Sequence, residues 1–223
     1  MATRSLLIAD ILAGVYEEAL MSHARGRLVD LGCGAVPLYG LYRKLVEEVI
    51  CLDRLPASLR SARHLDVIGD LNAGIPLRNA SVDTLLATDV LEHLWDPGPL
   101  WRDVPSVLRP GGKLILGVPF LYRIHEAPDD YLRYTRFALE RLCATMSLEV
   151  VSLKPYAGPL AVLLDLVGKN LPGESVSRLY QSVAGGILRS PFGRHLDRRH
   201  RELFPLGYCL VALRPDHRNT RCR

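Results

Sequence analysis

Apolar runs of strand length alternate with helical stretches along most of the chain. The strand candidates are rich in Val, Leu and Ile and lie at 27–32, 48–53, 64–70, 82–89, 113–120, 148–155 and 208–215. Helices fit at 5–22, 36–47, 97–108 and 135–146, and one or two more fit between 158 and 190. Strands that are apolar throughout and separated by helices indicate a parallel sheet covered on both faces. The pattern therefore predicts an α/β fold.

Two local signals bear on the boundaries of these elements. The turn RPGG at 109–112 predicts that a helix ends before the fifth strand, because Pro and Gly stop helices. Thr135 precedes the next helical stretch and suits its N-cap, since the hydroxyl can accept a backbone hydrogen bond there. The helix at 135–146 should therefore start directly after a polar segment.

Composition limits the class of protein. With 223 residues, 48% of them hydrophobic, the chain suits a single domain over 1–223 with an added lobe. A formal charge of +4 does not by itself imply nucleic acid, and none is expected as a partner. The five cysteines are odd in number and form no Cys-x-x-Cys pair, which argues against a disulfide framework or zinc site and favours a reducing cytoplasm. No segment reaches the ~20 apolar residues that cross a bilayer.

Polar residues gather where the first five strands end. Gly32 to Gly34 follow the first strand, Asp53 ends the second, Asp70 the third and Asp89 the fourth. The polar stretch 119–135 follows the fifth strand. In an open parallel sheet, ligands bind beyond the carboxyl ends of the strands, so these residues should share one site.

The glycines and acids favour one class of nucleotide over another. Gly32 and Gly34 would let the backbone approach a ligand closely, and Asp53, roughly 20 residues further on, could bind both hydroxyls of a ribose. A dinucleotide site needs a third glycine, and Pro37 stands there instead. A pocket rich in carboxylates suits a cation better than a pyrophosphate, which disfavours a nicotinamide-dependent oxidoreductase.

A series of short motifs carries a family resemblance. VDLGCG at 29–34, LD at 52–53, GDL at 69–71, ATDVLEHL at 87–94 and LRPGG at 108–112 occur in order between Leu28 and Phe120. The series resembles that of class I S-adenosylmethionine-dependent methyltransferases. This resemblance implies a Rossmann-like, seven-stranded, mostly parallel sheet with helices on both faces and an antiparallel last strand. It also implies S-adenosylmethionine as the cofactor.

The resemblance also assigns roles at the cofactor. It implies that the loop Gly32, Cys33 and Gly34 faces the methionine part and that Asp30 organises this loop. Asp53 would hold the ribose. The remaining implied contacts are Asp70 and Leu71 around the adenine, and Asp89 near the sulfonium. From the residues alone, Asp30 could instead satisfy loop amides, and Asp89 could cap the turn that follows it.

The stretch PFLYRIHEAPDDYLRYT, 119–135, supplies the candidates for the acceptor side. Methyl transfer needs the acceptor to be aligned and often deprotonated, and histidine suits proton removal at neutral pH. We expect His125 to be the base, Asp130 to orient it, and Arg133 either to pair with Asp130 or to grip an anionic acceptor. His93 is a second candidate base. A loop of ion pairs is the competing interpretation. Metal binding by His125, Glu126 and Asp129 is a further alternative, but no metal is predicted because the spacing does not demand one.

Two segments flank this core. We expect residues 1–25 to form an N-terminal helical lid and 157–202 to form a variable helical insertion before the last strand. The cluster of five arginines between 189 and 201 could attract phosphate, although a solvated basic face explains it equally well. A peripheral membrane contact and a homodimer stay open.

The sequence therefore predicts methyl transfer from S-adenosylmethionine to a hydroxyl, or an amine, of a small molecule. A sugar, a glycan intermediate or a secondary metabolite heads the list, since the 119–135 stretch resembles a methyltransferase branch of bacterial glycan and secondary-metabolite pathways. An RNA or protein acceptor is one alternative. A domain that binds the cofactor without catalysis, and serves as a partner or regulator, is the other.

Overall fold

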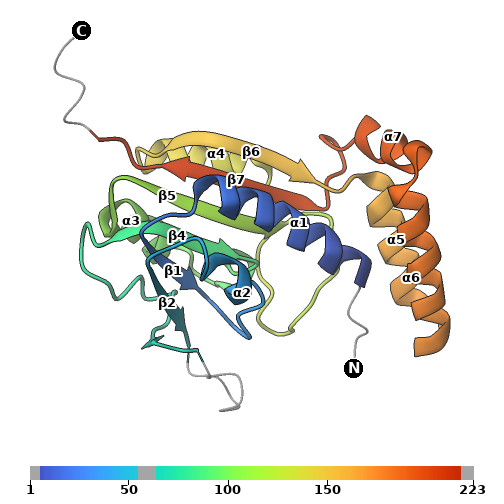
Figure 1. Cartoon of the computed structure of the whole chain (residues 1–223), viewed down its shortest axis with the longest axis horizontal. Coiled ribbons are helices and arrows are strands. Elements are labelled where there is room, and N and C mark those ends of the chain that lie inside the picture. The colour runs from blue at the N-terminus through green and yellow to red at the C-terminus, as the bar shows by residue number, and fades with distance from the viewer. Residues whose placement is uncertain (1–5, 55–63, 217–223) are drawn as a thin grey trace, which may run out of the picture.

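The computed structural model describes residues 6–54 and 64–216, and within them seven strands form one sheet (Figure 1). The strand order is β3-β2-β1-β4-β5-β7-β6. The strands are β1 (Arg27–Leu31), β2 (Glu48–Asp53), β3 (Val67–Ile68), β4 (Val82–Thr88), β5 (Leu108–Pro119), β6 (Glu149–Tyr156) and β7 (Gly207–Leu213). The helices are α1 (Leu6–His23), α2 (Tyr39–Tyr42), α3 (Gly98–Val107), α4 (Arg136–Thr145), α5 (Pro159–Asn170), α6 (Glu174–Arg189) and α7 (Pro191–Arg199), with a 3-10 turn η2 (Leu91–His93).

The strand directions confirm the predicted fold class. Strands β1 to β5 pair in parallel, and β7 runs antiparallel to both β5 and β6. The carboxyl ends of β1 to β5 therefore lie at one edge, as a parallel sheet requires. From β1 the chain adds β2 and β3 on one side and then β4 and β5 on the other side. This change of direction in strand order lies beside the glycines that follow β1.

Both faces of the sheet are buried, and alternate residues of each central strand serve the two faces. Leu86 and Ile115 belong to the apolar cluster that includes α1. Leu85 and Leu114, their chain neighbours, belong to the cluster that includes α3 and α4. The apolar strands read from the sequence are therefore continuous because helices cover each side.

The predicted helix at 36–47 is wrong in length, since only Tyr39–Tyr42 is α-helical. Val36 has a positive φ of 49° and is followed by Pro37, so regular helix cannot begin before that point. The next residues form turns with hydrogen bonds three residues apart, such as the Lys44 amide to the Leu41 carbonyl at 3.2 Å. Because β1 and β2 pair in parallel, the chain must still cross back along the sheet between them, and it does so through this single helical turn and the turns beside it.

Three further boundaries differ from the sequence prediction. Strand β3 is only two residues long and pairs with β2 alone, at the edge of the sheet. The helix α3 ends before RPGG as predicted, but β5 already begins at Leu108 and pairs irregularly with β4 before Lys113. A third helix, α7, follows the predicted helical region, and the Ser190 hydroxyl caps it by accepting the Gly193 amide at 3.0 Å. The cap at Thr135 is confirmed by the Ala138 amide at 3.2 Å.

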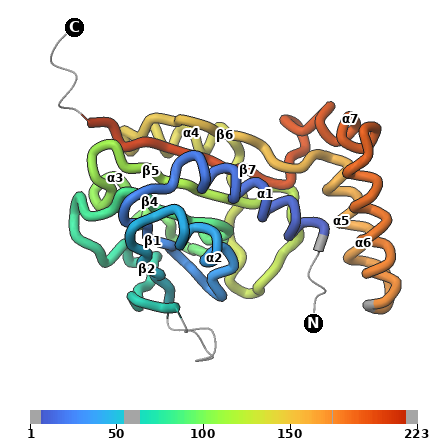
Figure 2. Tube along the Cα trace, in the orientation of Figure 1, coloured from blue at the N-terminus to red at the C-terminus, as the bar shows by residue number. Residues whose placement is uncertain are grey.

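Helices α5, α6 and α7 stand together at one end of the sheet, between β6 and β7 in the chain (Figures 1 and 2). The buried carboxylate of Asp197 on α7 accepts the amides of Gly158 and Ala161, which ties α7 to the start of α5. Helix α1 lies along β5 and β7 and reaches α6 (Figure 2). No helix of the described residues is long and apolar enough to span a membrane. Residues 1–5 of the predicted lid lie outside the described residues.

Candidate active site

The loop after β1 is built for close approach by a ligand. Gly32 and Gly34 have φ values of +64° and +51°, which L side chains rarely adopt. A Cβ on Gly32 would lie 2.7 Å from a methyl carbon of Val90, whereas a Cβ on Gly34 would point into open space. The amides of Gly32 and Cys33 donate to the Leu52 carbonyl at 2.8 and 3.2 Å, so β2 holds the loop in place. Gly34 is therefore the exposed side of the turn and Gly32 its packed side.

The acid at the end of β2 lies against this loop. One Asp53 oxygen accepts the Gly34 amide at 2.7 Å and the other accepts the Arg54 amide at 2.7 Å. Asp70 follows β3, the strand next to β2, and is exposed. One of its oxygens accepts hydrogen bonds from the backbone amide and the side-chain amide of Asn72, each at 2.9 Å. Leu71 beside it is buried. The structure therefore brings the glycine loop and Asp53 into contact and places Asp70 on the next strand along.

Asp30 sits behind the loop in the core. Its side chain is only 4% exposed, and one oxygen accepts the Tyr42 hydroxyl at 2.7 Å. Burial raises the pKa of Asp30 to about 7, although the Tyr42 hydrogen bond opposes this shift. The partner that the structure gives Asp30 is thus a tyrosine of α2, and its predicted role in organising the glycine loop stays a prediction.

Asp89 ends β4 in a left-handed conformation, with φ of +54°. Both of its carboxylate oxygens lie 3.2 Å from the hydroxyl of Tyr16, which comes from α1. Burial raises the pKa of Asp89 to about 6, against the effects of Tyr16 and His93. Helix α1 therefore reaches the site through one buried hydroxyl.

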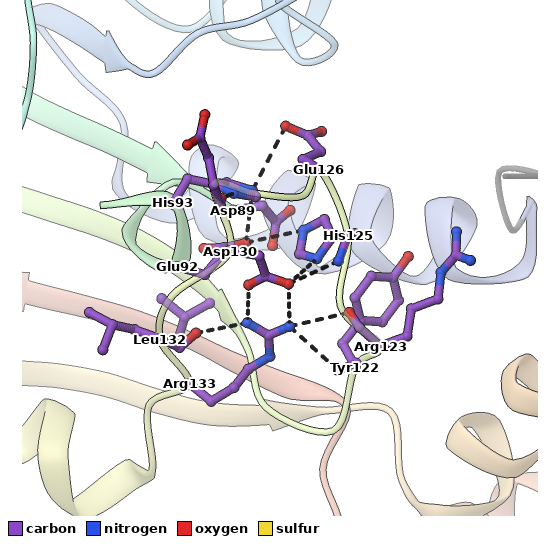
Figure 3. Close-up of polar contacts among 12 residues, drawn as sticks. Asp89, Glu92, His93, Tyr122, Arg123, His125, Glu126, Asp130, Leu132 and Arg133 are labelled. Carbon is purple, nitrogen blue, oxygen red and sulfur yellow. Dashed lines mark hydrogen bonds and ion pairs between the residues drawn. The ribbon is translucent and has the colours of Figure 1, made fainter. Parts of the chain in front are cut away.

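The 119–135 stretch folds into a loop held by one ion pair (Figure 3). The Arg133 guanidinium donates to both oxygens of Asp130, and also to the carbonyls of Tyr122, Arg123 and Leu132. This arginine lowers the pKa of Asp130 well below its usual range. Of the two roles predicted for Arg133, the structure shows the pairing with Asp130.

Two histidines and a glutamate meet inside this loop (Figure 3). The rings of His93 and His125 pack edge to face with centroids 4.9 Å apart. Nε2 of each histidine lies 3.8 Å from Oε1 of Glu92, whose side chain is fully buried. Burial raises the pKa of Glu92 to about 9 and lowers the pKa of His125. His125 is therefore a neutral imidazole near pH 7, as a proton acceptor must be.

The two halves of the site touch at its rim. Arg54, next to Asp53, donates to the Asp129 carboxylate at 3.1 Å. The Asp129 carbonyl in turn contacts Nδ1 of His93. The cofactor side predicted from β1 to β3 and the acceptor side predicted from 119–135 are thus joined in one site.

Known proteins resemble parts of this chain. Residues 29–116 match the family model described as a methyltransferase domain. This segment, which is less than half of the chain, is therefore similar to a methyltransferase domain. The ubiquinone biosynthesis O-methyltransferase of Xanthomonas euvesicatoria is 31% identical over 113 residues, which cover 45% of this chain and 46% of that protein. The chain spans less than half the length of the curated relatives that it matches first.

Solved structures share this fold over most of the chain. An S-adenosylmethionine dependent methyltransferase from Mesorhizobium loti has a TM-score of 0.59 at 16% identity, covering 90% of this chain and 96% of that one. The 1,6-didemethyltoxoflavin-N1-methyltransferase of Burkholderia thailandensis, solved with S-adenosylhomocysteine and 1,6-didemethyltoxoflavin, has a TM-score of 0.55 at 13% identity, covering 95% and 80%. These structures confirm the predicted Rossmann-like fold, and the family match supports the resemblance to methyltransferases.

Three buried side chains at the site were missed as site residues in the sequence. Tyr16 and Tyr42 each hold one buried acid, and Glu92 faces both histidines. The adjacency of Glu92 and His93 directly after a strand was the available signal, because a tight turn there directs both toward the ligand edge. The two tyrosines gave no signal, since each is an ordinary apolar position of a helix.

Proposed function

We propose that the chain transfers the methyl group of S-adenosylmethionine to a hydroxyl, or to an amine, of a small molecule. One observation carries the proposal: the open glycine loop with Asp53 and the pair of histidines lie at the same edge of the sheet, joined through Arg54 and Asp129. A donor held on the first group faces an acceptor held at the second. This is the arrangement that an in-line displacement at a methyl carbon requires.

Each residue then has a defined task. Gly34 and Asp53 bind the methionine part and the ribose, while Asp70 and Leu71 border the adenine. Asp89 lies nearest the sulfonium, where a carboxylate balances its charge. Nε2 of His125 takes the hydroxyl proton as the acceptor oxygen attacks the methyl carbon. The carbon–sulfur bond breaks and S-adenosylhomocysteine leaves.

Asp130 and Arg133 act as positioning residues. The His125 amide donates to Asp130 at 2.9 Å, and Nδ1 of the same histidine lies 3.2 Å from that carboxylate. The Asp130 charge favours a proton on Nδ1 electrostatically, without a hydrogen bond between Nδ1 and any described residue, and so leaves the lone pair on Nε2. The remaining donors of Arg133 hold the loop that carries His125, so we assign this arginine to the loop in place of the acceptor.

A hydroxyl is favoured over an amine by two considerations. An alcohol or phenol must lose a proton during transfer, and the half-buried His125, whose pKa is lowered by desolvation, suits that step. The Xanthomonas relative is named as an O-methyltransferase. A sugar, glycan intermediate or secondary metabolite fits the proposal as the acceptor.

The test uses His125→Ala and the matched control His195→Ala, which removes an exposed histidine on α7. Formation of S-adenosylhomocysteine is measured with a panel of hydroxylated sugars and phenols, and binding of S-adenosylhomocysteine is measured by calorimetry. We expect His125→Ala to bind the product normally and to slow transfer by about 100-fold or more. Equal turnover of the two variants would remove His125 from the mechanism. Binding without transfer to any acceptor in the unsubstituted protein would favour a non-catalytic role.

A further inference from the structure

Three electron-pair donors converge on one space inside the 119–135 loop (Figure 3). They are Oε1 of Glu92, Nε2 of His93 and Nε2 of His125, and they lie within 4.8 Å of one another. Both histidine nitrogens lie 3.8 Å from the glutamate oxygen. Two of the ligands come from η2 and the third from a different loop, so local sequence spacing could not have indicated the set.

The contacts behind the two rings define which nitrogens carry lone pairs. Nδ1 of His93 contacts the backbone carbonyl of Asp129, which can only accept a hydrogen bond. Nδ1 of His125 lies 3.2 Å from the carboxylate of Asp130, which also accepts. For His93 this contact places the proton on Nδ1 in the neutral ring and leaves the lone pair on Nε2. For His125 the nearby Asp130 charge favours the same tautomer, although Nδ1 makes no hydrogen bond to any described residue. A carbonyl or carboxylate behind the distal nitrogen is the usual support of a metal-bound histidine.

Glu92 is a buried carboxyl group that lacks hydrogen-bond partners among the other described residues. Its side chain is fully buried, and neither oxygen accepts a hydrogen bond from another described residue. A buried carboxylate without such partners is costly, because desolvation penalises its charge. Asp89 and Asp130 add negative charge around it, and Arg133 is the basic residue whose charge acts on it favourably. A cation bound between the three donor atoms would offset this cost and would replace the proton that Glu92 otherwise holds.

We propose that Glu92, His93 and His125 bind a divalent first-row transition-metal ion such as Zn²⁺. Two imidazoles and one carboxylate with open positions form a common catalytic zinc set. Bonds of 2.0–2.1 Å at a tetrahedral angle separate ligand atoms by about 3.4 Å. The two histidine–glutamate distances of 3.8 Å are close to this value, and the three ligand atoms, which lie within 4.8 Å of one another, must draw together to reach it. Mg²⁺ suits the set poorly, since it favours oxygen ligands.

The metal ion adds a second component to the proposed function. Its binding by the three side chains does not depend on that function, and only the choice of the acceptor oxygen as its fourth ligand rests on it. At the open position it would hold the acceptor oxygen and lower the pKa of that hydroxyl, whose proton passes to water. His125 is then a ligand of the ion, and the ion replaces His125 as the agent that activates the acceptor. Glu126 lies 4.0 Å from Nε2 of His93 at the exposed rim and stays outside the ligand set.

The test measures metal binding by itself. The full chain is stripped with a chelator and titrated with Zn²⁺ by calorimetry, and with Co²⁺ while its visible absorption is recorded. Glu92→Gln and His125→Ala are compared with His195→Ala, and circular dichroism confirms that each variant is folded. We expect one tight site in the unsubstituted chain and in His195→Ala. Glu92→Gln and His125→Ala should each weaken it at least tenfold, and Mg²⁺ should not compete.

Two outcomes would overturn the inference. One is the absence of a saturable one-to-one site for either metal in the stripped chain. The other is a site whose affinity is the same in Glu92→Gln and His125→Ala as in His195→Ala. If the stripped protein transfers methyl groups at full rate with chelator present, the metal site fails as a part of catalysis while the methyltransferase proposal stands. If the metal binds as expected and no acceptor is methylated, the metal site stands and the proposed function fails.

Discussion

At the scale of single residues, the site depends on buried acids that each hold a tyrosine. Asp30 accepts from Tyr42 and Asp89 from Tyr16, and burial raises the pKa of both carboxyls. One neutral donor cannot offset the loss of hydration around a full charge. Stability should therefore change when these groups ionise, and Asp30 is the clearer case because it lies away from the histidine cluster.

The variant Asp30→Asn tests whether ionisation of Asp30 lowers the stability of the fold, because the effect should depend on pH. The folded-state pKa of Asp30 is raised to about 7 from 3.8, so the folded state holds this proton more tightly than the unfolded state. The stabilisation that the folded state gains from this tighter proton binding is fully present below pH 3.8 and is lost as pH rises toward 7. Asparagine keeps an acceptor for Tyr42 without the charge. We expect the variant to gain about 2–4 kcal/mol in free energy of unfolding relative to the unsubstituted chain between pH 4 and pH 8.

Urea unfolding at a series of pH values checks this expectation, with Glu48→Gln, an exposed residue on β2, as the control. The same difference between Asp30→Asn and the unsubstituted chain at pH 4 and at pH 8 would contradict the assigned cause.

The sequence was informative about residues that end strands and uninformative about their partners. Asp53, Asp70 and Asp89 could be located because each directly follows an apolar run. Tyr16 could not be paired with Asp89, since 73 residues separate them and only the folded sheet brings them together. Glu92 was not singled out from its motif, and only the fold of the 119–135 loop places His125 against it.

At the scale of elements, the 119–135 loop is rigid for a definable reason. Arg133 contacts both oxygens of Asp130 and three carbonyls, so one side chain closes the loop onto itself. The amides of Tyr131 and Leu132 donate to the Glu92 carbonyl at 2.7 and 3.3 Å, which fixes the loop to η2. The positions of both histidines depend on this network.

Arg133→Lys should loosen the loop without disturbing the sheet. A lysine ammonium cannot supply the planar, bidentate contacts that the guanidinium makes. We expect faster hydrogen exchange at the amides of 122–132, at least tenfold at His125, with exchange in β4 and β5 unchanged. Mass spectrometry of hydrogen exchange measures this, and Arg136→Lys, whose ion pairs with Glu140 and Glu202 are partly exposed, is the matched control. Equal exchange in the two variants would show that Arg133 does not hold the loop.

The docking of α1 depends on a glycine in β5. A Cβ on Gly117 would lie 2.1 Å from the Tyr16 hydroxyl, and Tyr16 is only 3% exposed. Gly117→Ala must displace Tyr16 and break its contacts with Asp89. We expect a loss of about 1–3 kcal/mol and a melting temperature several degrees lower. Gly40→Ala, where an added Cβ meets nothing within 4 Å, should melt close to the unsubstituted chain. Equal melting temperatures would contradict the close packing of α1 on β5.

Elements were predicted well where burial was continuous and poorly where local backbone geometry interrupts a helix. Strands β1, β2 and β4 agree closely with their apolar runs. The helix expected at 36–47 shrinks to one turn, because Val36 has a positive φ and Pro37 follows it. Helix α7 was overlooked, although the Ser190–Pro191 pair is a recognisable start signal.

At the scale of the molecule, the sheet collects residues from the whole first half of the chain at one edge. Strand order alone brings Gly34, Asp53 and Asp89 together, and the parallel direction of β1 to β5 places them on the same side. Helix α1 lies along β5 and β7, whereas α5 to α7 form a separate group at the end of the sheet (Figure 1). The predicted role of α1 as a lid stays a prediction.

Binding of S-adenosylhomocysteine by calorimetry, in the unsubstituted chain, in Asp53→Ala and in Glu48→Ala, tests the central claim most directly. Asp53 and Glu48 are acids at opposite ends of β2, so the pair compares the ligand edge of the sheet with its far edge. The account predicts one site per chain, no heat with NAD, an affinity at least tenfold weaker in Asp53→Ala, and no change in Glu48→Ala. Undiminished affinity in Asp53→Ala, or binding of NAD in place of the nucleoside, would contradict it.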